Sequence, residues 1–256
     1  MRSTIIAAFT ILCCATVPQS AGAQAPATAA APRAYLEPAD FPDPRTYLPA
    51  PPAPGTPGFA ADRAAYVAAL AGKDGRAWKR AVSQARVRSP AVAGQIMCAI
   101  GARVDPAPTS AFGRLMQRSA VTLSQASEQS KAAWNRNRPY VGEKGAVTCD
   151  PDANFGTQSP GYPSGHAGIG WMWGLMLSQL APERTNQLLA WGAELGENRI
   201  ACRVHYPSDV AAGRMLGAAL LARMQGDPAF RADMEAARAE IAAARASAPA
   251  PDCSAD

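Results

Sequence analysis

The chain has 256 residues, of which 48% are hydrophobic and 18% are charged, and its formal net charge is +5. This composition provides enough apolar side chains for a full-sized core and excludes an intrinsically disordered chain. The positive charge does not indicate nucleic-acid binding, because Lys and Arg are scattered among acidic residues and form no long basic run interleaved with aromatic residues. We therefore expect a small anionic molecule, and no nucleic acid, as the binding partner.

Residues 1–23 have the pattern of a secretory signal peptide. Arg2 lies in a short leading segment, residues 5–17 are mainly apolar, and residues 21–23 form a small-residue cleavage site. The sequence therefore predicts an exported, periplasmic protein.

Two further observations predict a free product without stable membrane insertion. Cys13 and Cys14 are not preceded by the small residue that a lipoprotein signal carries. No later stretch reaches the roughly 18 uncharged apolar residues of a membrane span. Residues 167–181 come nearest, and we expect a buried core helix there.

Removal of the signal peptide leaves Cys98, Cys149, Cys202 and Cys253. In an exported chain, four cysteines predict two disulfides, with four buried free thiols as the alternative. The three pairings are equally open at this stage.

Composition divides the rest of the chain into three segments. Residues 24–58 are rich in Ala and Pro, which disfavours a continuous helix or a central strand and predicts a tether or a surface-hugging arm. Residues 59–246 form the expected catalytic domain, and residues 247–256 form a tail.

Helix caps and helical spacing of apolar residues recur along this domain, whereas strand-like alternation is almost absent. Thr56 caps the first expected helix, residues 57–70, and Pro57 suits its first turn. The later expected helices start at Asp74, after Ser89, near Thr109 or Ser110, after Ser164, at Pro182, at Ser208 and after Asp227, the last one ending near Ala244.

Two segments of this domain stand out. Residues 139–163 contain many Gly and Pro residues and predict a long irregular loop, a feature that is usually functional. The helix after Ser164 is apolar nearly all round, as a buried central helix should be. We expect an all-α fold, with one compact helical domain around this helix.

The chain has only two histidines, His166 and His205, and each lies in a polar cluster at the edge of an expected helix. Three cations accompany them: Lys131, Arg138 and Arg199. Each residue alone has an ordinary explanation, such as an exposed helix-end cation or a capped turn. Together they indicate a phosphate site with an activated nucleophile.

The chemistry of phosphate esters accounts for these residue types. A phosphomonoester carries nearly two negative charges, which cations neutralise, and arginine forks match its oxygens. Ser164 and the backbone N–H of Gly165 add donors at a helix N-terminus, and Gly165 has no Cβ to keep a phosphate away. His205 is the expected nucleophile, and Asp209, four residues later, can bind one nitrogen of its ring. His166 can then protonate the departing alkoxide.

This arrangement resembles the bacterial class A non-specific acid phosphatases, members of the type 2 phosphatidic acid phosphatase superfamily, which also contains the vanadium haloperoxidases. The family pattern is Lys-x6-Arg-Pro, then Pro-Ser-Gly-His, then Ser-Arg-x5-His-x3-Asp. Residues 131–139, 163–166 and 199–209 match it in order, and the resemblance extends from about Tyr47 to residues 227–230.

The resemblance implies an all-α acid phosphatase with defined residue roles. His205 becomes phosphorylated, Asp209 orients it and His166 is the general acid. The residues that hold the phosphate are Lys131, Arg138, Ser164, Gly165 and Arg199.

The third motif departs from the family pattern at two places. Asn198 replaces the usual serine, so any hydrogen bond from that serine must come from a longer side chain. Tyr206 and Pro207 replace the commoner Trp-Gln, a change that alters the expected pocket wall.

These observations predict a secreted, metal-independent acid phosphatase that hydrolyses small phosphate monoesters and uses no cofactor. The histidines, Asp150 and Asp152 show no zinc-ligand spacing. Inorganic phosphate and vanadate are the expected inhibitors. Because His166 must be protonated and His205 neutral, we expect a bell-shaped pH profile that peaks below neutrality.

Two relatives of the same superfamily remain as alternatives: a vanadate-dependent haloperoxidase and a lipid or pyrophosphate phosphatase. A phosphate-binding protein without turnover is disfavoured, because a binder has no use for a carboxylate-held histidine beside a second histidine. An interaction protein acting through residues 24–58 is the other class considered. The sequence leaves the preferred ester, the disulfide pairing and homo-oligomerisation open.

Overall fold

The computed structural model describes residues 33–150, 153 and 160–253, so the expected signal peptide and the first part of the expected arm lie outside it. Within these residues the regular structure is helical, and the sheet-like pairing found there is an isolated antiparallel bridge between Asn137 and Pro160. The prediction of an all-α fold is confirmed, and the described residues belong to one compact unit.

The main helices follow the expected order along the chain. They are α1 (Pro57–Ala68), α2 (Arg76–Ser83), α3 (Pro90–Ile100), α4 (Ala111–Trp134), α5 (Gly165–Leu180), α6 (Thr185–Ala201), α7 (Pro207–Met224) and α8 (Pro228–Ser247). Short 3-10 turns lie at Pro38–Asp40, Pro44–Thr46, Ala69–Gly72 and Pro182–Arg184.

Side-chain caps form where the sequence predicts them. In each case an Oγ or carboxylate oxygen of the N-cap residue accepts a hydrogen bond from the backbone N–H three residues later, which satisfies an otherwise unpaired donor of the first turn. The N-caps are Thr56, Ser89, Ser110, Ser164 and Asp227.

Three expected helix starts are wrong by one to three residues. A 3-10 turn occupies Pro182–Arg184, so α6 begins at Thr185 and not at Pro182. Asp74 has a φ of 62°, which excludes it from a helix, and α2 begins at Arg76 with Gly75 as its N-cap. α7 begins at Pro207, so Ser208 lies inside its first turn. There the Ser208 hydroxyl binds the carboxylate of Asp62 on α1, a contact that local sequence does not reveal.

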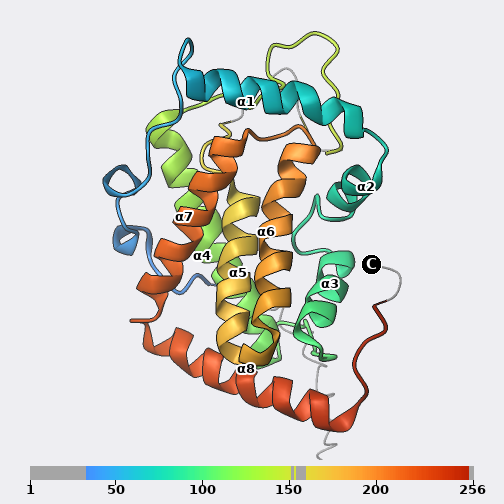
Figure 1. The fold of residues 1–256 in the computed structure, drawn as a ribbon. Helices are drawn as coiled ribbons and strands as arrows, with labels where there is room; N and C mark the ends of the chain where they lie inside the picture. Colours follow the sequence, from blue (N-terminus) through green and yellow to red (C-terminus); the bar gives the residue numbers. More distant parts are fainter. Residues whose placement is uncertain (1–32, 151–152, 154–159, 254–256) are drawn as a thin grey trace, which may run out of the picture. The chain divides into compact units, whose positions relative to one another are not determined.

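The helix after Ser164 is the buried centre of the bundle, as expected. α5 packs against α4, α6 and α7 (Figure 1), and its inward residues are almost completely buried. Glycines bring the backbones close together: a Cβ on Gly170 would lie 2.7 Å from the Gly192 carbonyl oxygen, and one on Gly213 would clash with the Ser164 carbonyl oxygen. Close approach therefore fixes the start of α5 against α7.

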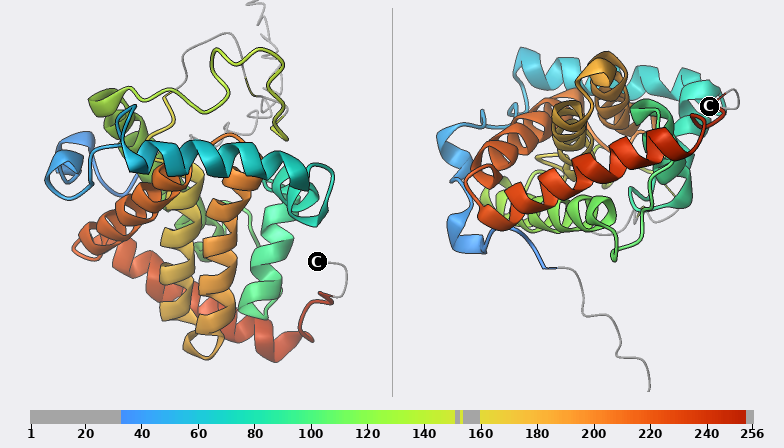
Figure 2. Two further views of the ribbon diagram at one scale, coloured as in Figure 1. Left: turned by 45° about the horizontal axis from the view of Figure 1, so that its top comes forward. Right: turned by 90° about the horizontal axis from the view of Figure 1, so that it is seen from below.

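The directions of the helices decide where the motifs meet. α4 and α6 end at the same end of the bundle at which α5 and α7 begin (Figure 1). α1 crosses this end, and α8 crosses the opposite end (Figures 1 and 2). Residues from four helix termini are thereby collected under α1.

Segments outside the bundle also contribute to its packing. From the described part of the expected arm, Tyr35, Leu36 and Leu48 are buried in the main core cluster. No helix in the described ranges combines the length and apolar character that crossing a bilayer requires.

Both expected disulfides form, and the structure decides their pairing. Cys98 of α3 is bonded to Cys253, and Cys149 is bonded to Cys202 at the end of α6.

Candidate active site

The residues of the three motifs lie together at the α1 end of the bundle. His205 is in the short connection between α6 and α7, and Asp209 is in the first turn of α7. His166 is in the first turn of α5, while Arg199 and Lys131 are in the last turns of α6 and α4.

The hydrogen bonds of His205 fix its tautomer. Nη1 of Arg138 lies 2.9 Å from Nε2 of His205, and Oδ2 of Asp209 lies 3.3 Å from Nδ1. A guanidinium can only donate, so Nε2 is an acceptor and the ring proton is on Nδ1, facing the carboxylate. His205 is therefore a neutral imidazole with its lone pair on Nε2.

Burial and neighbouring charge keep His205 in this state. Burial lowers its pKa well below the usual value, and the cations Arg138, Arg199 and Lys131 lower the pKa further. The lone pair consequently stays available in mildly acidic solution, where an exposed histidine is protonated.

His166 has a different partner. It is half-buried, and its Nε2 lies 2.9 Å from the carbonyl oxygen of Ala85. Because a carbonyl only accepts, Nε2 carries a hydrogen and Nδ1 is the nitrogen left for proton exchange. Burial and the charge of Arg199 lower the pKa of His166 well below its usual value, and the Ala85 carbonyl opposes this shift.

Arg199 is a buried cation with unpaired donors. The sequence alone had also allowed a solvated arginine at this position. Its side chain is 2% exposed, and Nη2 donates to Oδ2 of Asp150 at 2.6 Å. Nε and Nη1 have no hydrogen-bond partner among the described residues. Leaving such donors unpaired is costly, so this edge of the guanidinium suits an arriving anion.

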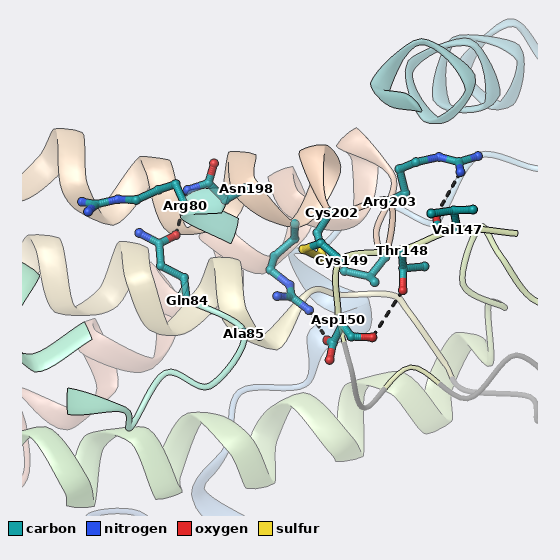
Figure 3. The surroundings of a disulfide bond; sticks show 12 residues. Arg80, Gln84, Ala85, Val147, Thr148, Cys149, Asp150, Asn198, Cys202 and Arg203 are labelled. Atoms are coloured by element: carbon teal, nitrogen blue, oxygen red, sulfur yellow. Dashed lines mark hydrogen bonds and ion pairs between the residues drawn. A yellow bond between two sulfur atoms is a disulfide. The ribbon is translucent and has the colours of Figure 1, made fainter. Parts of the chain in front are cut away.

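The Cys149–Cys202 disulfide holds the Arg199 partner in place. It joins the loop after α4 to the end of α6, and Asp150 follows Cys149 directly (Figure 3). The backbone N–H of Cys149 also donates to the carbonyl oxygen of Cys202, and Arg203 donates to the carbonyl oxygen of Val147 at 2.9 Å. Asp150 is thus fixed at the site by covalent and hydrogen bonds next to it.

Asn198, which replaces the family serine, uses its side-chain amide for hydrogen bonds within the protein. Its Nδ2 donates to Oε1 of Gln84 at 2.8 Å (Figure 3). It also donates to Oε1 of Glu194 at 3.2 Å. Asn198 therefore connects α6 to the segment that follows α2, one residue before Ala85.

The remaining expected phosphate ligands lie at the ends of α4 and α5. Lys131 is mostly buried and pairs with the exposed Glu128 at 2.6 Å, a kind of pair that is weak in water. Ser164 is buried, and its N–H donates to the Asp209 carbonyl oxygen. A Cβ on Gly165 would lie 3.2 Å from Oγ of Ser127, a buried hydroxyl that has no partner among the described residues.

Besides Asp150, two charged residues of this site, Arg136 and Asp62, were not predicted from the sequence. Arg136 binds the carboxylate of Asp209 at 2.6 Å and that of Asp62 at 2.7 Å. The doubled arginine of Arg136 and Arg138 was the available signal for Arg136. Nothing local marks Asp62, because its helix lies far away in the sequence.

Cations and hydrogen-bond donors dominate the site. Across the residues that the structure describes, no group of three His, Cys, Asp or Glu side chains is arranged to hold a metal ion. The guanidinium and ammonium groups among them are of the kind that suits a phosphate.

Comparison with known proteins agrees with this geometry. Residues 116–227, which contain all three motifs, match the PAP2 superfamily. The chain is 34% identical over 210 residues to an acid phosphatase of Zymomonas mobilis, and the alignment covers 82% of this chain and 80% of that protein. The chain belongs to the PAP2 superfamily.

Other proteins with similar sequences carry the same kind of name. A non-specific acid phosphatase of Salmonella typhimurium is 34% identical over 198 residues, covering 76% of this chain and 78% of that protein. A non-specific acid phosphatase of Providencia stuartii is 29% identical over 210 residues, covering 81% and 84%. The resemblance predicted from the motifs is confirmed, and the chain is an acid phosphatase of this superfamily.

Proposed function

We propose that this acid phosphatase is exported and hydrolyses small phosphate monoesters, without a metal ion, through a phosphohistidine on His205. The observation that carries the proposal is the state of His205. Asp209 accepts its Nδ1–H and Arg138 donates to Nε2, which leaves a neutral nucleophile among cations. His166 and Asp209 are the proposed general acid and orienting carboxylate.

The proposed reaction has two steps. Arg138 transfers its hydrogen bond from Nε2 to a phosphate oxygen, Nε2 of His205 forms a bond to phosphorus, and the ester P–O bond breaks. The departing alkoxide takes a proton from His166. A water molecule, deprotonated by His166, then attacks phosphorus and breaks the P–N bond, which releases inorganic phosphate and restores both histidines.

Three cations supply the charge that supports a metal-independent reaction. The unpaired edge of Arg199, together with Arg138 and Lys131, can neutralise the phosphate. Ser164 and the Gly165 N–H add the N-terminus of α5. Inorganic phosphate and vanadate should bind the same groups and inhibit the enzyme.

Substrate binding also bears on the expected pH optimum. Without an anion, burial and Arg199 hold the pKa of His166 well below its usual value. A bound phosphate offsets the charge of Arg199, raises the pKa of His166 and allows it to carry the proton that the leaving group needs. We therefore expect activity to peak below neutrality.

The periplasm is the proposed location. The signal pattern in residues 1–23 lies outside the described residues, so it remains a sequence-based argument. The Cys98–Cys253 and Cys149–Cys202 disulfides support it, because such bonds persist in oxidising compartments.

The decisive experiment compares wild type with His205→Ala on a chromogenic aryl phosphate at about pH 5 to 6 with EDTA present. Wild-type turnover in EDTA, loss of turnover in the variant, and a phosphorylated histidine trapped only in wild type under alkaline denaturing quench are expected. An exposed-residue variant, Lys73→Ala, is the matched control and should behave as wild type.

Other outcomes would redirect the proposal. Loss of wild-type turnover in EDTA would reject metal independence. Halide oxidation with vanadate and peroxide, without ester hydrolysis, would assign a haloperoxidase.

A further inference from the structure

A chain of buried charges runs from α1 to the proposed nucleophile. The guanidinium of Arg136 lies between two carboxylates: Nη2 is 2.7 Å from Oδ2 of Asp62, and Nη1 is 2.6 Å from Oδ1 of Asp209. The side chain of Arg136 is only 9% exposed, and both carboxylates are buried. Oδ2 of Asp209 then faces Nδ1 of His205.

The same groups also hold the first turn of α7. Asp62 accepts hydrogen bonds from the backbone N–H and the hydroxyl of Ser208. Nη1 of Arg136 donates to the Ser208 hydroxyl as well, and its guanidinium lies 4.4 Å from the centre of the Tyr206 ring. The segment from His205 to Asp209 is therefore hydrogen-bonded to α1 through Ser208 and Asp62.

Each oxygen of Asp209 has a defined use. Arg136 occupies Oδ1, while Oδ2 accepts from the Tyr206 backbone N–H at 2.9 Å and from His205. A carboxylate held at Oδ1 cannot rotate its Oδ2 away from the ring without breaking a short charged contact. Arg136 thus fixes the direction of the acceptor that selects the His205 tautomer.

We propose that Asp62 and Arg136 are positioning residues for the phosphoryl-transfer step, a proposal that rests on the proposed nucleophilic function of His205. Arg136 keeps Asp209 ionised and aimed at Nδ1. Asp62 keeps Arg136 and Ser208 in place from α1. Neither residue touches the substrate in this scheme, because the phosphate lies on the Nε2 side of the ring.

Several charged and titratable groups face Asp209 and bear on its ionisation. Burial raises the pKa of Asp209, and Arg136 and then Arg138 lower it. His205 lies at Oδ2, and Tyr162 is a further neighbour, whose pKa is raised first by burial and then by the charge of Asp209. Asp62 acts through Arg136, because it shares the same guanidinium.

Two variants have opposite expected effects on pH dependence. Arg136→Gln removes the main cation beside a buried carboxylate, so the acidic limb of kcat/KM should move to higher pH by about 1 unit. Asp62→Asn removes an anion that competes for Arg136, so the acidic limb should stay or move to lower pH. Both variants should lower kcat by about 10- to 100-fold, as loss of an orienting partner does elsewhere.

Further measurements separate positioning from binding and from folding. KM for an aryl phosphate and Kd for inorganic phosphate should change by less than about 3-fold, because the phosphate-facing cations remain. Arg136→Lys keeps the charge but loses the two-carboxylate fork, so its acidic limb should return towards wild type while kcat stays low. Arg118→Gln is the matched control, because it removes an arginine from another buried carboxylate, Asp233 on α8, and it should keep the wild-type pH profile.

The results that overturn the proposal are distinct from those that overturn the function. If His205→Ala is inactive but both variants lose only thermal stability, with wild-type kcat and pH limbs, the positioning proposal is wrong. The same holds if KM rises with kcat unchanged. If His205→Ala keeps full turnover, the proposed function fails and the positioning proposal fails with it. Should Arg136→Gln not fold, Arg136→Lys and Asp62→Asn decide the matter.

Discussion

Two buried carboxylates near opposite ends of the bundle are each held by arginines, yet only one of them lies beside a histidine. Asp209 at the α1 end binds Arg136 and His205. Asp233 on α8 binds Arg114, Arg118 and the hydroxyl of Tyr35.

The two networks differ in how they end. Around Asp233 the partners close on one another: Arg118 also lies over the Tyr35 ring, and Tyr35 comes from the segment before α1. Arg114 and Arg118 are 42% and 24% exposed, so water can reach them. This cluster holds the segment before α1 against the bundle, and the contacts described here do not extend from it to a histidine.

Around Asp209 the network stays open on one side. It passes through His205 to cations, and two nitrogens of Arg199 lack partners among the described residues. A buried carboxylate bound by arginines therefore does not by itself mark a functional site. The Asp209 network differs because it ends at a histidine, the proposed nucleophile, close to an arginine with unpaired donors.

Substitution of each carboxylate should separate the two networks most clearly. Asp209→Asn keeps the shape but can present an N–H to Nδ1, which selects the wrong tautomer and should lower kcat by about 10,000-fold, as in other carboxylate–histidine pairs. Asp233→Asn should leave kcat within about 2-fold and lower the free energy of unfolding by about 1 to 3 kcal/mol. Steady-state kinetics and urea unfolding of both variants check this, and equal kinetic losses would remove the distinction.

Arg199 gives the next largest effect. Arg199→Gln removes the unpaired edge proposed to hold phosphate, so kcat/KM should fall by about 100- to 1,000-fold. Inorganic phosphate should raise the Tm of wild type and of Arg118→Gln but not of Arg199→Gln. A phosphate-induced rise in Tm that survives in Arg199→Gln would place the anion elsewhere.

The pH dependence of stability sharpens the comparison further. The pKa values of His166 and His205 are lowered in the folded state. Below about pH 6.5 the unfolded chain therefore binds protons that the folded chain does not, and the free energy of unfolding falls as the pH falls. Above about pH 6.5 this contribution to the stability of the folded state is fully present. Each histidine contributes a slope of up to about 1.4 kcal/mol per pH unit.

Phosphate should flatten this slope, because its charge raises both pKa values towards normal. Urea unfolding between about pH 7 and pH 5, with and without phosphate, measures the change, and the range stays above the ordinary titration of Asp. Asp233→Asn should show the same slope as wild type. An identical slope with and without phosphate would contradict an anion site beside the histidines.

The smallest effect is expected at an exposed ion pair that also joins the segment before α1 to the bundle. Arg223 pairs with Asp40 at 2.9 Å, and the side chains are 42% and 47% exposed. Arg223→Ala should change the free energy of unfolding by less than about 1 kcal/mol and leave kinetics unaltered. A larger loss of stability in thermal or urea unfolding would mean that this exposed pair contributes as much as the Asp233 cluster.

Much of this molecule follows from short stretches of sequence. Caps such as Ser110 and Asp227 set helix starts, because a side-chain oxygen and the amides it binds are three residues apart. The motif residues could be predicted from the sequence, because histidines, cations and a glycine at a helix start are the groups that a phosphate-ester site requires. The expected start at Asp74 failed because its positive φ depends on how the preceding turn folds.

Contacts between distant segments could not be predicted in this way. The roles of Asp62, Asp150 and Gln84 depend on which helix ends meet, and no local pattern encodes that. Asn198 illustrates the difference: the motif pattern marks it as a departure from the family serine, but only the tertiary structure brings Gln84, after α2, within hydrogen-bond distance of it.

By itself, the sequence determined the helices, the motif residues and the family, because each depends on side chains that are neighbours in the chain or on an ordered pattern of residue types. The tertiary structure alone decided the disulfide pairs, the tautomer of His205 and the link from Asp62 through Arg136 to Asp209. Burial is the physical reason. Only when the helix ends pack together does water leave these charges, and their hydrogen-bond partners then become specific.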